Sequence, residues 1–192
     1  IRVLDGTVIK ANFGKLDILA EAGRGDIITT NAKIDSDGVI STAKIDIDVT
    51  VESTAQVIVG AAEIRNRFGT VTIGADSSEN SVNSIGSTDA SGLGTAPRAD
   101  ICNNITLTAN MAIKPNSKAV IEGTVVNIVS YIGSLYINGQ AYAKGSALGA
   151  DVDAISNQTI RLKANTEIDN ADITAHDRAD IYASVRPEYR SS

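Results

Sequence analysis

The chain has 192 residues, a formal net charge of −6 and a pI near 4.8, an acidic balance that excludes nucleic acid as an expected partner because phosphate binding needs a basic surface. No apolar run approaches the roughly 18 to 20 residues that span a bilayer, so no part is expected to be embedded in a membrane. Aromatic residues are 4% of a chain that is 43% hydrophobic, which requires a core of Ile, Val, Leu and Ala.

The first notable stretch, EAGRGDIITT at residues 21–30, contains Arg24, Gly25 and Asp26, the tripeptide that many adhesive proteins present to cell-surface receptors. Related phrases, both RADI, occur at residues 98–101 and 178–181. The shared pattern predicts a corner in which a small residue permits a tight bend and Asp bonds the local backbone. On this interpretation Gly25 could be exchanged for alanine. Receptor binding by an exposed loop is the alternative.

Acidic residues follow in two groups, DSDG at residues 35–38 and the alternating strand KIDIDVTVE at 44–52. Carboxylates at this spacing could donate oxygen ligands to calcium, and the candidate ligands are Asp35, Asp37, Asp46 and Asp48. The stretch has neither the third acid nor the distal Glu of an EF-hand loop, so a turn is the favoured interpretation. No other cofactor is expected.

Short alternating runs continue along the chain and predict strands rather than helices. They are TVTI at 70–73, NITLTA at 104–109, SLYING at 134–139 and TIRLKA at 159–164. Each has one apolar and one polar face, and Gly, Asn, Asp and Ser separate the runs. The chain is therefore expected to be all-β.

Internal repetition favours one kind of all-β fold. NITLTANMAI at 104–113 matches TIRLKANTEI 55 residues later, and AAEIRNRFGTVTI at 61–73 matches VVNIVSYIGSLYI at an offset of 64. Irregular repeats with a constant inward pattern are typical of stacked coils, so we predict a parallel β-helix, or β-solenoid, over residues 1–192. At about 20 to 29 residues per coil, each offset would span two or three coils. A β-sandwich also alternates but predicts no recurring phrases.

Two stretches, 74–100 and 138–153, are rich in Gly, Ala and Ser and are predicted to leave the coil as loop excursions. Loops on a rigid scaffold are common places for partner contacts, which makes their side of the molecule a candidate binding face.

Catalytic motifs are not evident. The single histidine, His176, lies near no Ser or Cys in a motif context and is expected to be a surface residue. The one cysteine, Cys102, provides neither a disulfide framework nor a zinc motif. Polysaccharide-cleaving enzymes also use β-helices, with carboxylates along a groove, so a lyase or hydrolase is the alternative function.

The Ala-x-Ile phrases, the Thr/Asn/Asp-rich strands and loops such as STDASGLGTAPRAD resemble the long repeat regions of filamentous haemagglutinin-type and leukotoxin-type surface exoproteins. The resemblance covers most of the chain. It implies a right-handed parallel β-helix, secretion across a Gram-negative outer membrane by a partner transporter, and a fibre used in adhesion or cell-cell contact.

The expected function is therefore a structural shaft or adhesion segment of a large extracellular filament on a bacterial cell surface, not an enzyme. Its expected partners are other segments of the same long chain, copies of itself in a fibre, and a host or neighbouring cell surface. The chain begins at Ile1 without a leader, which we interpret as a fragment of a longer protein.

Overall fold

The computed structural model describes residues 1–23 and 25–186, and within these ranges every regular element is a β-strand. No helix in this part of the chain has the length and apolarity to cross a membrane. The strands form four sheets, which we call A to D, and every strand pairing is parallel. The expectation of an all-β chain is confirmed. A sandwich of antiparallel sheets is excluded, because such sheets pair neighbouring strands in opposite directions.

Each sheet collects strands from distant parts of the chain. Sheet A has the order β1(Arg2–Val3), β5(Lys44–Val59), β9(Arg98–Ile113), β13(Asp153–Ile168). Sheet B has the order β14(Ala171–Val185), β10(Ala119–Ile132), β6(Glu63–Asp76), β2(Val8–Glu21). Sheet C contains β11(Leu135–Ser146), β7(Asn80–Ser91) and β3(Ile27–Asp37), and sheet D contains β12(Gly149–Ala150), β8(Gly94–Thr95) and β4(Ile40–Ser41).

The chain returns to the same place about every 55 residues. Asn138, for example, lies beside Asn83, its partner 55 positions earlier. We call one such stretch a rung: β1 to β4 form the first, β5 to β8 the second, β9 to β12 the third, and β13 and β14 the fourth. This stacking of parallel sheets is consistent with a β-solenoid.

The predicted coil length is wrong. One rung contains three long strands, of 16, 14 and 12 residues in the second rung, so 55 residues make one rung and not two or three coils. The repeat at an offset of 55 is the true register, because Ile105 pairs with Ile160 and Leu107 with Leu162. The repeat at 64 is not, because Ile64 pairs with Ile121 and Ile73 with Ile128.

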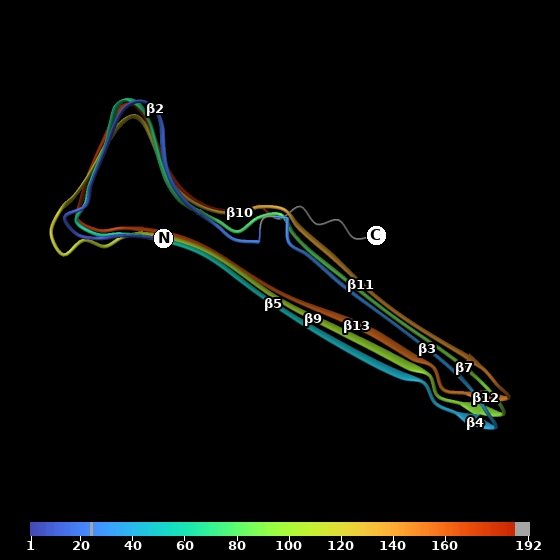
Figure 1. Cartoon of the computed structure of the whole chain (residues 1–192). Coiled ribbons are helices and arrows are strands. Elements are labelled where there is room, and N and C mark those ends of the chain that lie inside the picture. The colour runs from blue at the N-terminus through green and yellow to red at the C-terminus, as the bar shows by residue number, and fades with distance from the viewer. Residues whose placement is uncertain (24, 187–192) are drawn as a thin grey trace.

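The rungs have an elongated outline (Figure 1). Sheets A and C run side by side as a long arm, which sheet D closes at its far end, and sheet B bends sharply to form the wide part. We call the part formed by sheets A, C and D the arm, and the bend in sheet B the apex. At the apex Gly14 has a φ of 77°, a left-handed conformation that glycine adopts without strain. The buried Asn66 amide there donates to the carbonyl oxygens of Gly14 and Thr70, both at 3.1 Å, which joins the first two rungs.

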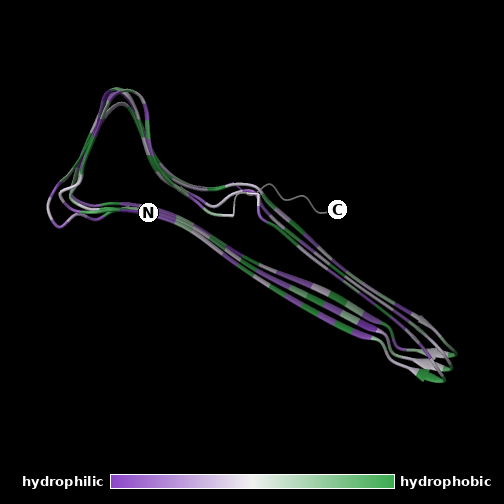
Figure 2. Cartoon of the chain, viewed as in Figure 1, coloured by the Kyte–Doolittle hydropathy of each residue, from purple (hydrophilic) through white to green (hydrophobic). Residues whose placement is uncertain are grey.

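Two aliphatic clusters fill the interior. One lies where sheet A meets sheet B and includes Val57, Ile64, Ile73, Met111 and Ile128. The other lies in the arm between sheets A and C, with Ile47, Ile101, Ile105, Leu107 and Leu135 among its members. Alternating colours along the strands in Figure 2 reflect this inward and outward pattern. In sheet B the inward side chains of the two middle rungs are buried, whereas those of the end rung are not: Ile128 is 0% exposed and its fourth-rung neighbour Ile181 is 47% exposed.

The two predicted loop excursions, 74–100 and 138–153, are wrong. Most of each is strand, because β7 and β8 fill the first and β11 and β12 the second. The physical reason is the narrow interior of the arm, where large residues of sheet A leave room for only small ones opposite. A Cβ added to Gly86 would lie 3.3 Å from Ile45 Cγ2 and 3.5 Å from Ile101 Cδ1. A small polar side chain can also be satisfied there, since buried Ser84 donates to Asn103 Oδ1 at 2.8 Å.

Candidate functional site

The Arg-Gly-Asp tripeptide lies at the turn between β2 and β3, although Arg24 itself is outside the described residues. Gly25 has a φ of 77° and donates its backbone N–H to the carbonyl oxygen of Glu79 at 3.2 Å. Asp26 uses backbone groups, donating to Gly23 O at 3.2 Å and accepting from Ser81 N at 2.9 Å. The turn is thus exposed and attached to the second rung through its main chain.

The three related phrases do not occupy equivalent corners, so that prediction is wrong. Residues 98–101 begin strand β9 in sheet A, and residues 178–181 lie inside β14 in sheet B. In both, the arginine pairs along the strand with its aspartate, at 2.6 Å between Arg98 Nε and Asp100 Oδ2 and at 2.9 Å in the fourth rung. An alternating strand places residues i and i+2 on one face, which explains the recurrence of Arg-x-Asp better than a bend does.

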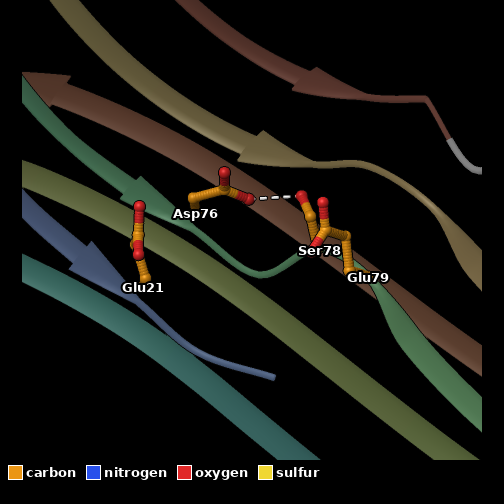
Figure 3. Close-up of a pocket in the computed structure, with 4 residues that line it drawn as sticks. All are labelled: Glu21, Asp76, Ser78 and Glu79. Carbon is orange, nitrogen blue, oxygen red and sulfur yellow. Dashed lines mark hydrogen bonds between the residues drawn. The ribbon is translucent and has the colours of Figure 1, made fainter. Parts of the chain in front are cut away.

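An acidic notch of about 140 Å³ lies beside this turn, lined by Glu21, Asp76, Ser78 and Glu79 (Figure 3). Glu21 and Asp76 are register partners at the ends of β2 and β6, and the Ser78 hydroxyl donates to the Asp76 carboxylate. Ser78 Oγ also accepts from Gly133 N at 2.9 Å, which connects this side of the notch to the third rung. Both glutamates interact with other groups. The spacing of 55 between Glu21 and Asp76 is the sequence signal that could have located it.

The four candidate calcium ligands lie on two different sheets. Asp35 and Asp37 belong to β3, where Asp35 pairs with Lys33 at 2.9 Å and Asp37 accepts a hydrogen bond from Ser91. Asp46 and Asp48 belong to β5, where Asp46 pairs with Lys44 at 2.7 Å. Within residues 1–23 and 25–186 the structure groups no three His, Cys, Asp or Glu side chains in a way that could hold a metal ion.

A ladder of alternating charges crosses sheet B. Glu63 Oε1 lies 2.9 Å from Lys10 Nζ and 2.8 Å from Arg65 Nε, and Arg65 in turn contacts Glu122 Oε2 at 2.8 Å. The ladder ends at His176, whose Nε2 is 3.3 Å from Glu122 Oε1, so the only histidine is an exposed member of β14. Hydrogen bonding to Lys10 lowers the pKa of Glu63, and hydrogen bonding to His176, together with the charge of Arg65, lowers the pKa of Glu122.

Both phenylalanines of the chain lie at the apex, exposed to solvent. Phe13 and Phe68 are register partners, 75% and 60% exposed, and their rings stack with centroids 5.6 Å apart. The Arg67 guanidinium lies 5.4 Å from the centre of the Phe68 ring. This pair is not among the residues predicted from the sequence, although the phrases NFG and RFG recur at a spacing of 55.

No protein family, curated protein or solved structure matches the chain.

Proposed function

We propose that this chain is a segment of the shaft of a large extracellular filament on a bacterial surface, wound as a right-handed parallel β-helix and used in adhesion. The observation that supports the proposal is the in-register stacking of one rung on the next with a continuous aliphatic interior. In such stacks each rung contacts only its neighbours, so length is gained by adding rungs. The chain is proposed to act mechanically and to carry out no reaction of its own.

Among the described residues, the sheet edges at both ends of the stack are open, which fits this role. At one end β1 pairs with Ile58 and Val59 of β5, and the Ile1 ammonium group donates to Gln56 O at 2.6 Å. No strand of the described residues pairs with residues 44–55 on this side. At the other end β11 and β12 are the outermost strands of sheets C and D, and β13 and β14 those of sheets A and B. Unpaired strand edges are templates for pairing with further chain. The partner of each end is proposed to be another segment of the same filament or another copy.

End-to-end association tests this proposal. We expect the chain to form rods whose length grows with concentration, measured by sedimentation velocity and negative-stain electron microscopy. Ile181→Lys places a charge on the inward face of the end rung and should reduce this growth. Tyr182→Lys is the matched control, because the two neighbours are 47% and 48% exposed but point to opposite faces of β14. A monomer of high thermal stability at every concentration would contradict the proposal.

Adhesion is tested separately, by coating a surface with the chain and counting the host or bacterial cells that attach. The exposed turn at Gly25 and Asp26 is the first place to test. Asp26→Glu retains the charge and extends the side chain by one methylene. Loss of attachment in this variant would assign adhesion to the turn, and retention would assign it to another surface. No attachment of cells to the unmodified chain would contradict an adhesive role.

A carbohydrate-active enzyme is a second candidate, and the acidic notch is the observation that favours it. Glycosidases use a pair of carboxylates, and Glu21 and Asp76 lie side by side in register. Incubation with a panel of acidic and neutral polysaccharides, followed by measurement of reducing ends, tests this function. Product formation that is lost in Glu21→Gln would establish it and overturn the assignment as a purely structural shaft.

A further inference from the structure

Large aliphatic side chains form an exposed column at the far end of the arm. Val39, Leu93 and Leu148 each precede the first residue of a sheet D strand, and those strands stack in register. Their exposed fractions are 71%, 61% and 94%. We call this column the ridge. Three consecutive rungs thus present an aliphatic residue to solvent at the same position.

A shallow apolar groove lies immediately beside the ridge. It is the outer surface of sheet D, and among its lining residues are Gly94, Ala96, Gly149 and Ala150. The ridge residue and the groove residues of a rung are consecutive in sequence, so the two features run in parallel along the stacking direction. Figure 1 shows this narrow end at β4 and β12, where the chain passes from sheet C through sheet D to sheet A. The ridge lies on the sheet C side and Ala96 on the sheet A side.

Charged residues flank the ridge and groove in two columns of opposite pattern. On sheet C, Asp35, Asp89 and Lys144 are register partners with the signs minus, minus, plus. On sheet A, a second set of register partners consists of Lys44, Arg98 and Asp153, and their charges are positive, positive and negative. All six side chains are substantially exposed. At these two positions each rung therefore carries charges of opposite sign. Two of the six also pair within the chain, because Lys144 Nζ lies 3.2 Å from Asp89 Oδ2. Further acidic residues nearby are Asp37 on sheet C and Asp151 beside the groove.

We propose that two copies of this chain pair side by side through the ends of their arms, with their stacking directions parallel. A two-fold axis along the stacking direction places the ridge of each copy against the groove of the other, as an isologous interface requires. It also places the sheet C column of one copy opposite the sheet A column of its partner, so within these two columns each acidic residue is on the side of a basic one. The reversed arrangement would set ridge against ridge and bring the two copies of Asp89 together.

The interface is small for a single pair of chains. Stable interfaces bury about 800 Å² on each partner, and three rungs spaced by about 4.8 Å offer much less. We therefore expect a dissociation constant of roughly 0.1 to 1 mM for the isolated chain. Because the contact repeats in each rung, a longer stack would gain avidity with length. The biological meaning of the pairing depends on the proposed filament, but the pairing itself does not require end-to-end growth.

Sedimentation equilibrium at about 0.05 to 2 mM, a range set by the expected affinity, tests the pairing. The measurement uses the Ile181→Lys background, which separates side-by-side dimers from end-to-end rods. Leu93→Asp with Leu148→Asp should weaken dimerisation at least tenfold. Phe13→Asp with Phe68→Asp is the matched control, because it changes a comparably exposed apolar pair at the apex and should leave the dissociation constant unchanged. Circular dichroism shows whether each variant is folded.

A charge exchange tests the orientation of the two copies. Asp89→Arg alone and Arg98→Asp alone should each weaken dimerisation, because each homodimer then opposes like charges at two places. An equimolar mixture of the two variants should restore it, since in the heterodimer both contacts between position 89 of one copy and position 98 of the other again join an acidic and a basic side chain. Dimerisation unaffected by the ridge variant, an absent dimer over the whole concentration range, or a mixture no better than either variant alone would overturn the proposal.

Discussion

Gly25 carries the backbone constraint at the Arg-Gly-Asp turn. Its φ of 77° lies in the left-handed region, where a Cβ costs about 1 kcal/mol. Gly25→Ala should therefore lower the free energy of unfolding by about 1 kcal/mol. The sequence comparison suggested that alanine would be tolerated, because RADI occurs twice elsewhere, but those copies lie in extended strands. The positive φ of this turn cannot be recognised from the amino-acid sequence of the tripeptide alone.

Urea denaturation measures this effect, with Gly94→Ala as a control at a glycine that has open space around its missing Cβ and no positive φ. Asp26→Ala should change stability less than Gly25→Ala, because the described hydrogen bonds of Asp26 use its backbone. Equal stability of the Gly25→Ala variant and the unmodified chain would contradict the strained-turn interpretation.

The charge ladder on sheet B makes stability depend on pH. The pKa values of Glu63 and Glu122 are lowered in the folded chain, so the unfolded chain binds protons more readily. Their stabilising contribution is present above the ordinary glutamate pKa of about 4.3 and is lost as the pH falls through the lowered values. The melting temperature should therefore decrease below about pH 4.5, more steeply at low salt, because exposed pairs are screened.

Glu63→Gln with Glu122→Gln is the variant that isolates this contribution. It should have a lower melting temperature than the unmodified chain at pH 7 and a weaker dependence on pH between about 5 and 3, since the two groups no longer titrate. Identical pH profiles of the two proteins by differential scanning calorimetry would show that the ladder contributes nothing measurable.

At the scale of elements, the alternating aliphatic strands were predictable and the small-residue strands were not. The run at 44–52 begins β5, and the runs at 104–109 and 159–164 lie within β9 and β13, because Ile, Val and Leu report inward positions directly. Strand β7 contains mostly Ser, Asn, Gly and Ala, a composition usual in loops. Its inward residues are small because large aliphatic side chains of sheet A fill the space opposite them. The sequence alone does not show which strands face each other.

Gly86 tests this account of β7. Gly86→Val adds a branched side chain at a position where even an added Cβ would lie 3.3 Å from Ile45 Cγ2, so overpacking should cost about 1 to 3 kcal/mol of unfolding free energy. Gly94→Val, at a glycine with open space, should cost less. Chemical denaturation of both variants measures the difference. A Gly86→Val variant as stable as the unmodified chain would indicate a roomier arm than the structure shows.

Deleting residues 78–91 is the corresponding test of the whole strand. The deletion removes the middle strand of sheet C, with buried Asn80, Val82 and Ala90, and should abolish cooperative unfolding. If the stretch were a loop, as its composition indicated, the circular dichroism and melting curve would hardly change.

At the scale of the whole molecule, the sequence predicted stacking but not the size of the unit that stacks. The repeat at 55 pairs Ala109 with Ala164 and Asn110 with Asn165, so repetition did identify register partners. Its interpretation as two or three coils assumed short strands, whereas the second rung uses strands of 12 to 16 residues. The acidic notch, the phenylalanine pair and the ridge were missed because each combines residues of different rungs, and only the correct repeat length brings them together.

The long rung has a consequence for what such a stack can build. Neighbouring strands are about 4.8 Å apart, so 55 residues advance the axis by one strand spacing, or roughly 0.1 Å per residue, against 1.5 Å in an α-helix. Spanning about 500 Å in this way would require on the order of 5,700 residues. The long rung instead makes the cross-section of the stack wide. A rod with an elongated cross-section bends easily in its thin direction and resists bending in its wide direction. A filament of these rungs would behave as a flat blade with one preferred direction of flexing, and pairing at the arm ends would broaden that blade further.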